Sequence, residues 1–287
     1  MIKAGNWKEA IAKLDSLPAL PAIAQKLLSL PLDTDEGEAK MLKLIAQDPL
    51  ISAKLIGLAN TSMFGSPIKV TSVNDAAMRL GLTRIKSVTI GLATMSTLAK
   101  APTGKLKAND LWKHSMAITV AMRIIAKAMP ARVRPLDDQL FLAGLLHDIG
   151  YMVLSYLDNK TSDELHTRLG SQSDRTPLEI EQELMGVSHG EIGALVGQHW
   201  NLPEEIIAVM RYHHTPDIQK AAEGQPLVSL VNFAERLLSD FRVVEHTAQE
   251  IADQEWLELG IDPAKVKEIK TQIAAASEQA HQLTDIL

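Results

Sequence analysis

Five of the nine histidines in this 287-residue chain, all within residues 114–214, follow an order that suits metal binding. Imidazole and carboxylate are the ligands that Fe, Mn, Zn and Mg accept without thiolates, and the chain has no cysteine. The histidines, with one adjacent aspartate, predict a divalent-metal site whose ligands come from several helices: His114, His147, Asp148, His189, His213 and His214.

The His147-Asp148 pair is the most informative part of this pattern. It lies inside Leu142–Gly150, an otherwise apolar run that ends at a glycine and is therefore expected in the core. A buried imidazole next to a buried carboxylate needs polar partners. The other histidines, which lie on different predicted helices, are the available ones. The alternative is a structural remnant, in which the imidazoles only hydrogen-bond one another within the core.

Apolar residues recur with helical spacing along almost the whole chain, and no alternating run bounded by hairpin turns occurs, so the fold is predicted to be all-α. Asp48, just before Pro49, has the sequence of a helix N-cap, and Asn60 is expected to end that helix. Residues 102–109 are the best candidate linker. They divide the chain into an N-terminal helical subdomain, 1–108, and a second helical subdomain, 109–287.

Composition excludes several classes of protein. The chain is 46% hydrophobic and 22% charged, which is typical of a globular domain with a sizeable core. The absence of cysteine excludes disulfide scaffolds, thiolate zinc sites and cysteine nucleophiles, and it fits a reducing compartment. No uncharged apolar run approaches the roughly 20 residues of a membrane span, and no secretory signal is recognised. We therefore expect a cytoplasmic protein that does not enter a membrane.

Charge is divided unevenly along the chain. Residues 69–108 carry seven basic residues against Asp75 alone, whereas residues 109–287 carry 15 basic and 27 acidic residues. A basic segment can bind nucleic acid, but the overall pI is about 5.9 and no platform of aromatic side chains accompanies the segment. We expect it to face the acidic second half or a protein partner, and nucleic acid is the less favoured partner.

The order of these residues resembles the His…His-Asp…Asp ligand set of the HD superfamily of metal-dependent phosphohydrolases. The resemblance implies that the six residues occupy metal-ligand positions and that the metal is Fe, Mn, Zn, Mg or Ni. It also places the closing aspartate within 228–236, where Asn232 is found instead. Tyr151 stands where catalytic relatives often have a lysine, and no Gly-Tyr-Pro motif follows His214. Each departure argues against turnover, and no residue is assigned a catalytic role.

The first half resembles the HDOD domain, the HD-related output domain of bacterial signalling proteins. The motifs that carry this resemblance are Leu17–Pro21, Gln47–Leu50, Lys54–Asn60, Phe64-Gly65 and Ser72–Gly81, and the likeness runs from about residue 14 to 240. It implies two packed helical subdomains, the second HD-like. It also implies signal-transduction regulation through an unidentified signalling protein or a nucleotide ligand, with weak catalysis or none. The alternative is an HD-type phosphohydrolase acting on a nucleotide or a cyclic dinucleotide.

Other polar residues near the pattern have ordinary interpretations. Asp110 is expected to be the N-cap of the helix that carries His114, although it could also reach a second metal. Arg211 and Lys113 could bind phosphate, but charges in such places are more often solvated. The remaining histidines are expected at the surface: His166, His199, His246 and His281.

Overall fold

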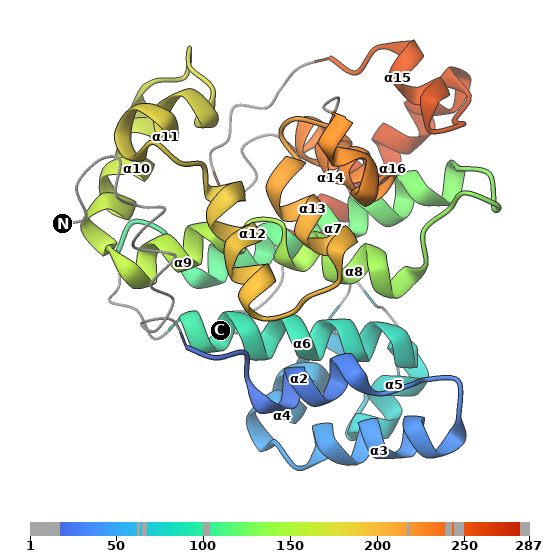
Figure 1. The fold of residues 1–287 in the computed structure, drawn as a ribbon. Coiled ribbons are helices and arrows are strands. Elements are labelled where there is room, and N and C mark those ends of the chain that lie inside the picture. Colours follow the sequence, from blue (N-terminus) through green and yellow to red (C-terminus); the bar gives the residue numbers. More distant parts are fainter. Residues whose placement is uncertain are drawn as a thin grey trace.

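The computed structural model describes residues 18–61, 64, 68–99, 104–216, 219–238, 243 and 250–281. Every regular element in these ranges is a helix, which confirms the all-α prediction (Figure 1). The front half contains α2 (Ala22–Ser29), α3 (Asp35–Ala46), α4 (Pro49–Ala59), α5 (Val73–Leu80) and α6 (Leu82–Leu98). The second half contains α7 (Ala108–Ala128), α8 (Asp137–Leu146), α9 (Ile149–Leu157), α10 (Asn159–Ser171), α11 (Pro177–Met185), α12 (His189–His199), α13 (Glu204–Tyr212), α14 (Leu227–Leu237), α15 (Asp253–Glu258) and α16 (Val266–His281).

Local sequence explains how the helices of the front half begin. The Asp48 carboxylate accepts hydrogen bonds from the backbone N–H groups of Leu50 and Ile51, so the predicted N-cap of α4 is confirmed. Ser72 and Asp75 form a reciprocal capping box at the start of α5. Both devices satisfy backbone donors that a helix leaves unpaired at its first turn.

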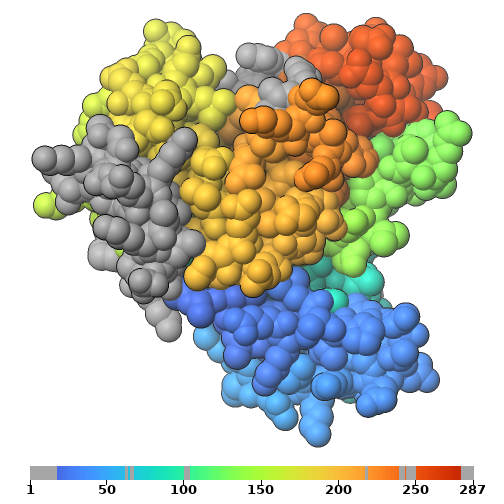
Figure 2. All heavy atoms as spheres, in the orientation of Figure 1, coloured from blue at the N-terminus to red at the C-terminus, as the bar shows by residue number. Residues whose placement is uncertain are grey.

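Helix α6 joins the two halves. It packs against α2 and α4 on one side and against α8 and α9 on the other, so one continuous hydrophobic core runs through both halves. In Figure 2 the front half forms the blue lobe below the gold and orange surface of the second half. The predicted linker is short, because residues 104–107 are not helical and α7 begins at Ala108. Its first residues, and the amphipathic start Trp7–Leu14, lie outside the described residues.

One segment, Asp137–Leu157, is long and apolar enough to cross a membrane. In this fold it is a pair of core helices, since 89% of its most apolar 18-residue window is buried inside the protein. The segment is α8 followed by α9, and the helix is interrupted between them at His147 and Asp148. Two polar side chains therefore enter the centre of an apolar segment at the point where the helix is interrupted.

Two glycines allow neighbouring helices to come close to this break. A Cβ at Gly144 would lie 2.4 Å from the Thr119 hydroxyl of α7, and a Cβ at Gly150 would lie 2.0 Å from the His189 carbonyl of α12. Any larger residue would push α7 or α12 away. The close approaches hold His114 of α7 and His189 of α12 on either side of the His147-Asp148 break.

Candidate metal centre

The structure brings all six predicted residues together. His114 comes from α7, His147 and Asp148 from the break between α8 and α9, His189 from the first turn of α12, and His213 and His214 from the end of α13. Glu235 of α14, which the sequence analysis did not select, joins them. We call these seven residues the His/carboxylate cluster: His114, His147, Asp148, His189, His213, His214 and Glu235.

One side of the cluster contains two imidazoles and two carboxylates. The Asp148 Oδ2 atom lies 3.4 Å from His114 Nε2 and 3.3 Å from His147 Nε2. His147 Nε2 also lies 3.3 Å from Glu235 Oε1. One ligand atom from each of these four residues lies within 4.8 Å of all the others, so the group has the composition and the spacing of a metal site.

The other side of the cluster contains three imidazoles. His189 Nε2 lies 3.1 Å from His213 Nε2 and 3.2 Å from His214 Nε2. The second oxygen of Asp148, Oδ1, lies 3.4 Å from His189 Nε2 and 3.5 Å from His213 Nε2. Asp148 therefore faces both groups of ligands, one with each carboxylate oxygen.

Hydrogen bonds on the outer side fix the tautomers of three histidines. His147 Nδ1 is 2.9 Å from the Gly144 carbonyl, and His213 Nδ1 is 2.9 Å from the Val209 carbonyl. A carbonyl only accepts, so each Nδ1 carries the proton and donates it. His189 Nδ1 donates in the same way to the Glu181 carboxylate at 2.6 Å. In the neutral form, each Nε2 then presents a lone pair to the centre, which is the orientation that a metal ligand needs.

Without a metal, protons balance the buried carboxylates. Burial by itself lowers the pKa of His147, but the charges of Asp148 and Glu235 outweigh it and raise that pKa well above its usual value. Burial also lowers the pKa of His189, and Glu181 and Asp148 raise it well above the usual value. His214 behaves oppositely: burial and the neighbouring His213 lower its pKa to about 3. Positive charge is therefore stabilised at the centre of the cluster and not at His214 on its edge.

The donor set fits a divalent ion. Both oxygens of Asp148 and both of Glu235 are buried and have no hydrogen-bond donor within the described part of the chain. The separations of 3.3–3.4 Å within the first group exceed ordinary hydrogen bonds between such atoms. Ligands about 2.1 Å from a shared ion lie roughly 3.0–3.4 Å apart. A cation between these atoms would balance carboxylates that pair with no arginine or lysine among the described residues.

Two buried residues, Glu181 and Tyr151, contact His189, and the half-buried His166 lies beside Tyr151. Glu181 of α11 is fully buried and accepts from both the Nδ1 and the backbone N–H of His189, the latter at 3.0 Å. The Tyr151 ring stacks on the His189 ring at 4.1 Å, so a buried aromatic ring occupies the place where catalytic relatives were expected to have a lysine. The ring of His166 lies 5.4 Å from that of Tyr151.

The prediction that His166 lies at the surface is wrong. Its Nε2 is buried without a hydrogen-bond partner among the described residues, and burial lowers the pKa of His166 to about 4. The apolar side of α10 packs on α9, and the histidine is carried inward with it. His199 is exposed, as predicted. His246 and the His281 side chain lie outside the described residues.

The expectation that Asn232 occupies the position of the closing carboxylate ligand is also wrong. Asn232 Nδ2 donates to the His213 carbonyl at 2.9 Å, so this side chain holds the backbone of a cluster residue. The carboxylate that enters the cluster is Glu235, about one helical turn later on the same face of α14. A sequence signal existed, because Glu235 is the acidic residue of α14 and lies three residues after Asn232.

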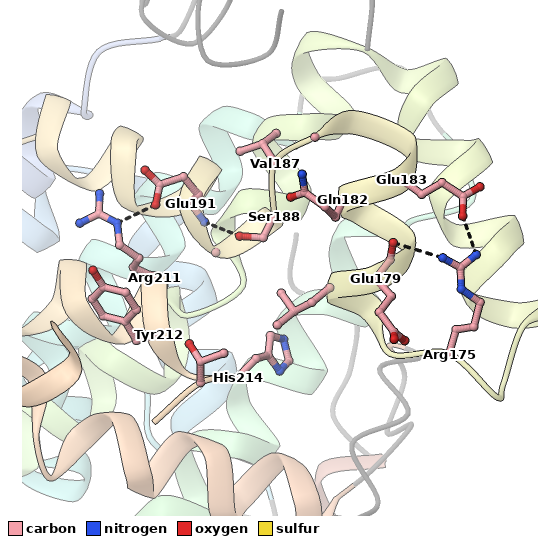
Figure 3. A pocket seen from close by; sticks show the side chains of 14 residues that line it. Arg175, Glu179, Gln182, Glu183, Val187, Ser188, Glu191, Arg211, Tyr212 and His214 are labelled. Carbon is pink, nitrogen blue, oxygen red and sulfur yellow. Dashed lines mark hydrogen bonds and ion pairs between the residues drawn. The ribbon is translucent and has the colours of Figure 1, made fainter. Parts of the chain in front are cut away.

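A cleft of about 910 Å³ opens beside the cluster, between α11 and the α12–α13 pair (Figure 3). His214 is the cluster residue that lines it. Arg211 lies on one side of the cleft and is paired with Glu191 at 2.8 Å, while Arg175 lies on the other and is paired with Glu183. Of the other predicted phosphate contacts, Lys113 is buried in α7. Asp110 is not the N-cap of α7, because Lys107 takes that position and Asp110 lies in the first turn.

The basic side chains of segment 69–108 donate mainly to backbone carbonyls of the front half. Arg79 donates to the carbonyls of Ala59 and Ile68. Arg84 forms an ion pair with Asp137 of α8 at 2.7 Å, which is a link to the acidic half. Lys86 donates to the Leu30 carbonyl, and Lys100 lies outside the described residues. That the rest of this segment faces the acidic half or a protein partner stays a prediction.

Comparison with known proteins agrees with the fold. A model of the HDOD domain family matches residues 17–216. The chain is 26% identical over 236 residues to an uncharacterized protein of Treponema pallidum (strain Nichols), a match that covers 81% of this chain. The chain spans only 45% of that relative's length.

Solved structures share the architecture. An HDOD domain protein of unknown function from Geobacter sulfurreducens superposes with a TM-score of 0.79 at 23% identity, over 96% of each chain. A Marinobacter aquaeolei VT8 protein, provisionally described as a signal transduction protein, gives 0.82 at 22% identity over 98% of this chain and 66% of its own. A provisionally assigned phosphohydrolase of Shewanella amazonensis SB2B gives 0.70 at 20% identity, over 99% and 100%. These likenesses establish the fold.

Proposed function

The chain belongs to the HDOD domain family, and from this premise we propose that it is a regulatory module of signal transduction that acts by binding rather than by turnover. The His/carboxylate cluster would hold one or two divalent ions. The cleft beside His214 would receive a signalling protein or a nucleotide, and the protein would work in the cytoplasm.

The single observation that carries this proposal is the burial of the cluster. Six of its seven side chains are at most 3% exposed, and His214 is 9% exposed. A phosphoester must bring its phosphorus to the metal-bound nucleophile, and of these seven side chains His214 alone lines the adjacent cleft, so that approach is restricted. Tyr151, packed on His189, provides no cation for the developing phosphate charge. An ion held there would tie α7, α12, α13 and α14 together.

Imidazole and carboxylate chemistry limits the ion. The four-residue group offers two nitrogens and two carboxylates, and the second group offers three nitrogens and one oxygen of Asp148. Such mixed N/O sets suit Fe, Mn, Zn or Ni better than Mg, which prefers oxygen ligands. When bound, the ion would supply the positive charge that the buried carboxylates need.

The alternative, an HD-type phosphohydrolase, is favoured by one observation. The two oxygens of Asp148 face separate ligand groups, an arrangement that suits a carboxylate bridging two ions. Arg211 also lines the adjacent cleft, where a phosphate could meet it.

Metal analysis and an activity panel separate the two proposals. The full-length protein, purified without added metal, is analysed for bound transition metals and then assayed on nucleotides, cyclic dinucleotides and a generic phosphodiester with Mn, Fe, Mg and Ni in turn. We expect bound metal and no turnover. Turnover near 1 s⁻¹, the low end for enzymes, that disappears in His147→Ala would establish the phosphohydrolase. Absence of metal, together with no uptake on titration, would overturn the metal assignment.

A further inference from the structure

The segment that begins at Glu250 contacts α14 through one arginine and one pair of aromatic rings. The Arg236 guanidinium bridges both carboxylate oxygens of Glu255 on α15, at 2.5 and 3.1 Å, and donates to the Glu250 carbonyl. Beside this ion pair, the Trp256 ring meets the Phe233 ring edge to face at 4.8 Å. The planar guanidinium matches a carboxylate with two parallel bonds, so the pairing is geometrically specific.

The same guanidinium also contacts the support of the cluster. Arg236 Nη1 donates to Asn232 Oδ1 at 3.3 Å, and Asn232 Nδ2 donates to the His213 carbonyl at 2.9 Å. An amide side chain has one accepting end and one donating end. Because Arg236 binds the amide oxygen of Asn232, the amide nitrogen faces His213. Glu255, Arg236 and Asn232 thus form a chain of contacts that runs from α15 to the backbone of His213.

We propose that residues 250–258 are a regulatory arm of the His/carboxylate cluster, and that Arg236 and Asn232 are the positioning residues through which docking of the arm sets the geometry of His213 and His214. This inference rests on the proposed metal binding. The arm, Arg236 and Asn232 lie beyond the 17–216 match to the family model.

Physical linkage gives the arm its regulatory effect. When Glu255 leaves, Arg236 loses its strongest partner and can turn away from Asn232, and the Asn232 amide loses its fixed orientation. The His213 carbonyl then loses its hydrogen bond at the end of α13, and the imidazoles of His213 and His214 are less well placed for an ion. By reciprocity, a bound ion must favour the docked arm by the same free energy.

The test uses Co²⁺ as the probe in the full-length chain. Co²⁺ affinity is measured by competition with a chelator, and its visible absorption spectrum reports the ligand geometry. Glu255→Gln keeps the size of the side chain and removes the charge that holds Arg236. We expect about a tenfold loss of affinity, the low end of the effect of losing an outer-shell partner, together with an altered spectrum. Glu258→Gln, on the exposed side of the same helix, is the matched control and is expected to leave both unchanged.

A double-mutant cycle tests the route. Asn232→Ala is expected to weaken Co²⁺ binding, and Glu255→Gln is expected to add little to it, because both act through one chain of contacts. Co²⁺ is also expected to slow hydrogen exchange of the 253–258 amides in the wild type. Normal affinity and an unchanged spectrum in Glu255→Gln, or fully additive effects, would overturn the proposal. If the wild type binds no Co²⁺, the metal assignment fails first, which is a different result.

Discussion

Polar side chains in the front half and in the His/carboxylate cluster are satisfied in different ways. In the front half, Asn60 accepts from the Val70 N–H at 2.8 Å and donates to the carbonyls of Val70 and Ile56, while Arg79 donates to two further carbonyls. In the cluster, Asp148 and Glu235 have no hydrogen-bond donors among the described residues and face imidazole nitrogens instead. The first arrangement is complete within the protein, whereas the second becomes complete when a cation is present.

This contrast separates two roles that a polar motif can have. The asparagine and aspartate motifs that give the front half its family resemblance cap helices and connect loops. The His-Asp motif of the second half forms a buried site whose carboxylates pair with no arginine or lysine in the described part of the chain. Changes in the front half should therefore alter the stability of the fold and leave metal binding unchanged. Changes in the cluster should do the reverse.

The largest effect is expected for Asp148→Asn. Asp148 faces both ligand groups, so a neutral amide of the same size removes charge from each of them. Metal affinity should fall by more than the roughly 100-fold that an outer-shell change can cost. Metal analysis and the rise in Tm on adding Co²⁺ measure this loss. Circular dichroism serves as the control for an intact fold. If the variant retained its metal, the cluster would not be the metal site, and the contrast with the front half would fail.

A smaller loss is expected for Glu181→Gln. Glu181 does not face the centre of the cluster, but its carboxylate holds Nδ1 of His189 and makes that imidazole a stronger donor. Losing the charge while keeping the shape should weaken metal binding about 10–100-fold. Chelator competition measures the change. Glu183→Gln is the matched control on the same helix, because Glu183 is exposed and pairs only with arginines. Equal affinities in the two variants would show that the supporting carboxylate does not matter.

Sequence alone predicted the convergence of the six residues, because a His-Asp pair in an apolar run must find polar partners in the core. It failed where the outcome depends on how the helices pack. Asn232 and Glu235 lie three residues apart on one face of α14, and the packing shows which side chain enters the cluster. His166 was misplaced for the same reason, since a lone histidine in a polar stretch gives no sign that its side of α10 is covered. The role of Glu181 could not be predicted from the sequence, because the histidine that it contacts lies on another helix.

In the front half, Asn60→Ala should lower the free energy of unfolding and leave the affinity for metal unchanged. The change removes three hydrogen bonds and leaves the backbone groups of Val70, which is only 3% exposed, without partners. Unsatisfied buried groups of this kind cost about 1–3 kcal/mol. Urea unfolding of the metal-free protein measures the loss. Co²⁺ affinity is measured on the same sample and should equal that of the wild type. A fall in affinity would mean that the two halves are coupled through α6.

The smallest effect is expected for Asp48→Ala. Pro49 has no N–H, so the Asp48 carboxylate serves the next two donors of α4, Leu50 and Ile51. Loss of an N-cap of this kind costs typically about 1 kcal/mol, and urea unfolding can resolve it. Asp48→Asn is the decisive companion, because asparagine caps a helix about as well as aspartate but carries no charge. If capping is the role of Asp48, the asparagine variant retains nearly all of the stability and both variants keep wild-type Co²⁺ affinity. If the charge of Asp48 takes part in recognising a ligand or a partner, the asparagine variant fails together with the alanine variant. The assignment of front-half motifs to structure alone would then be wrong.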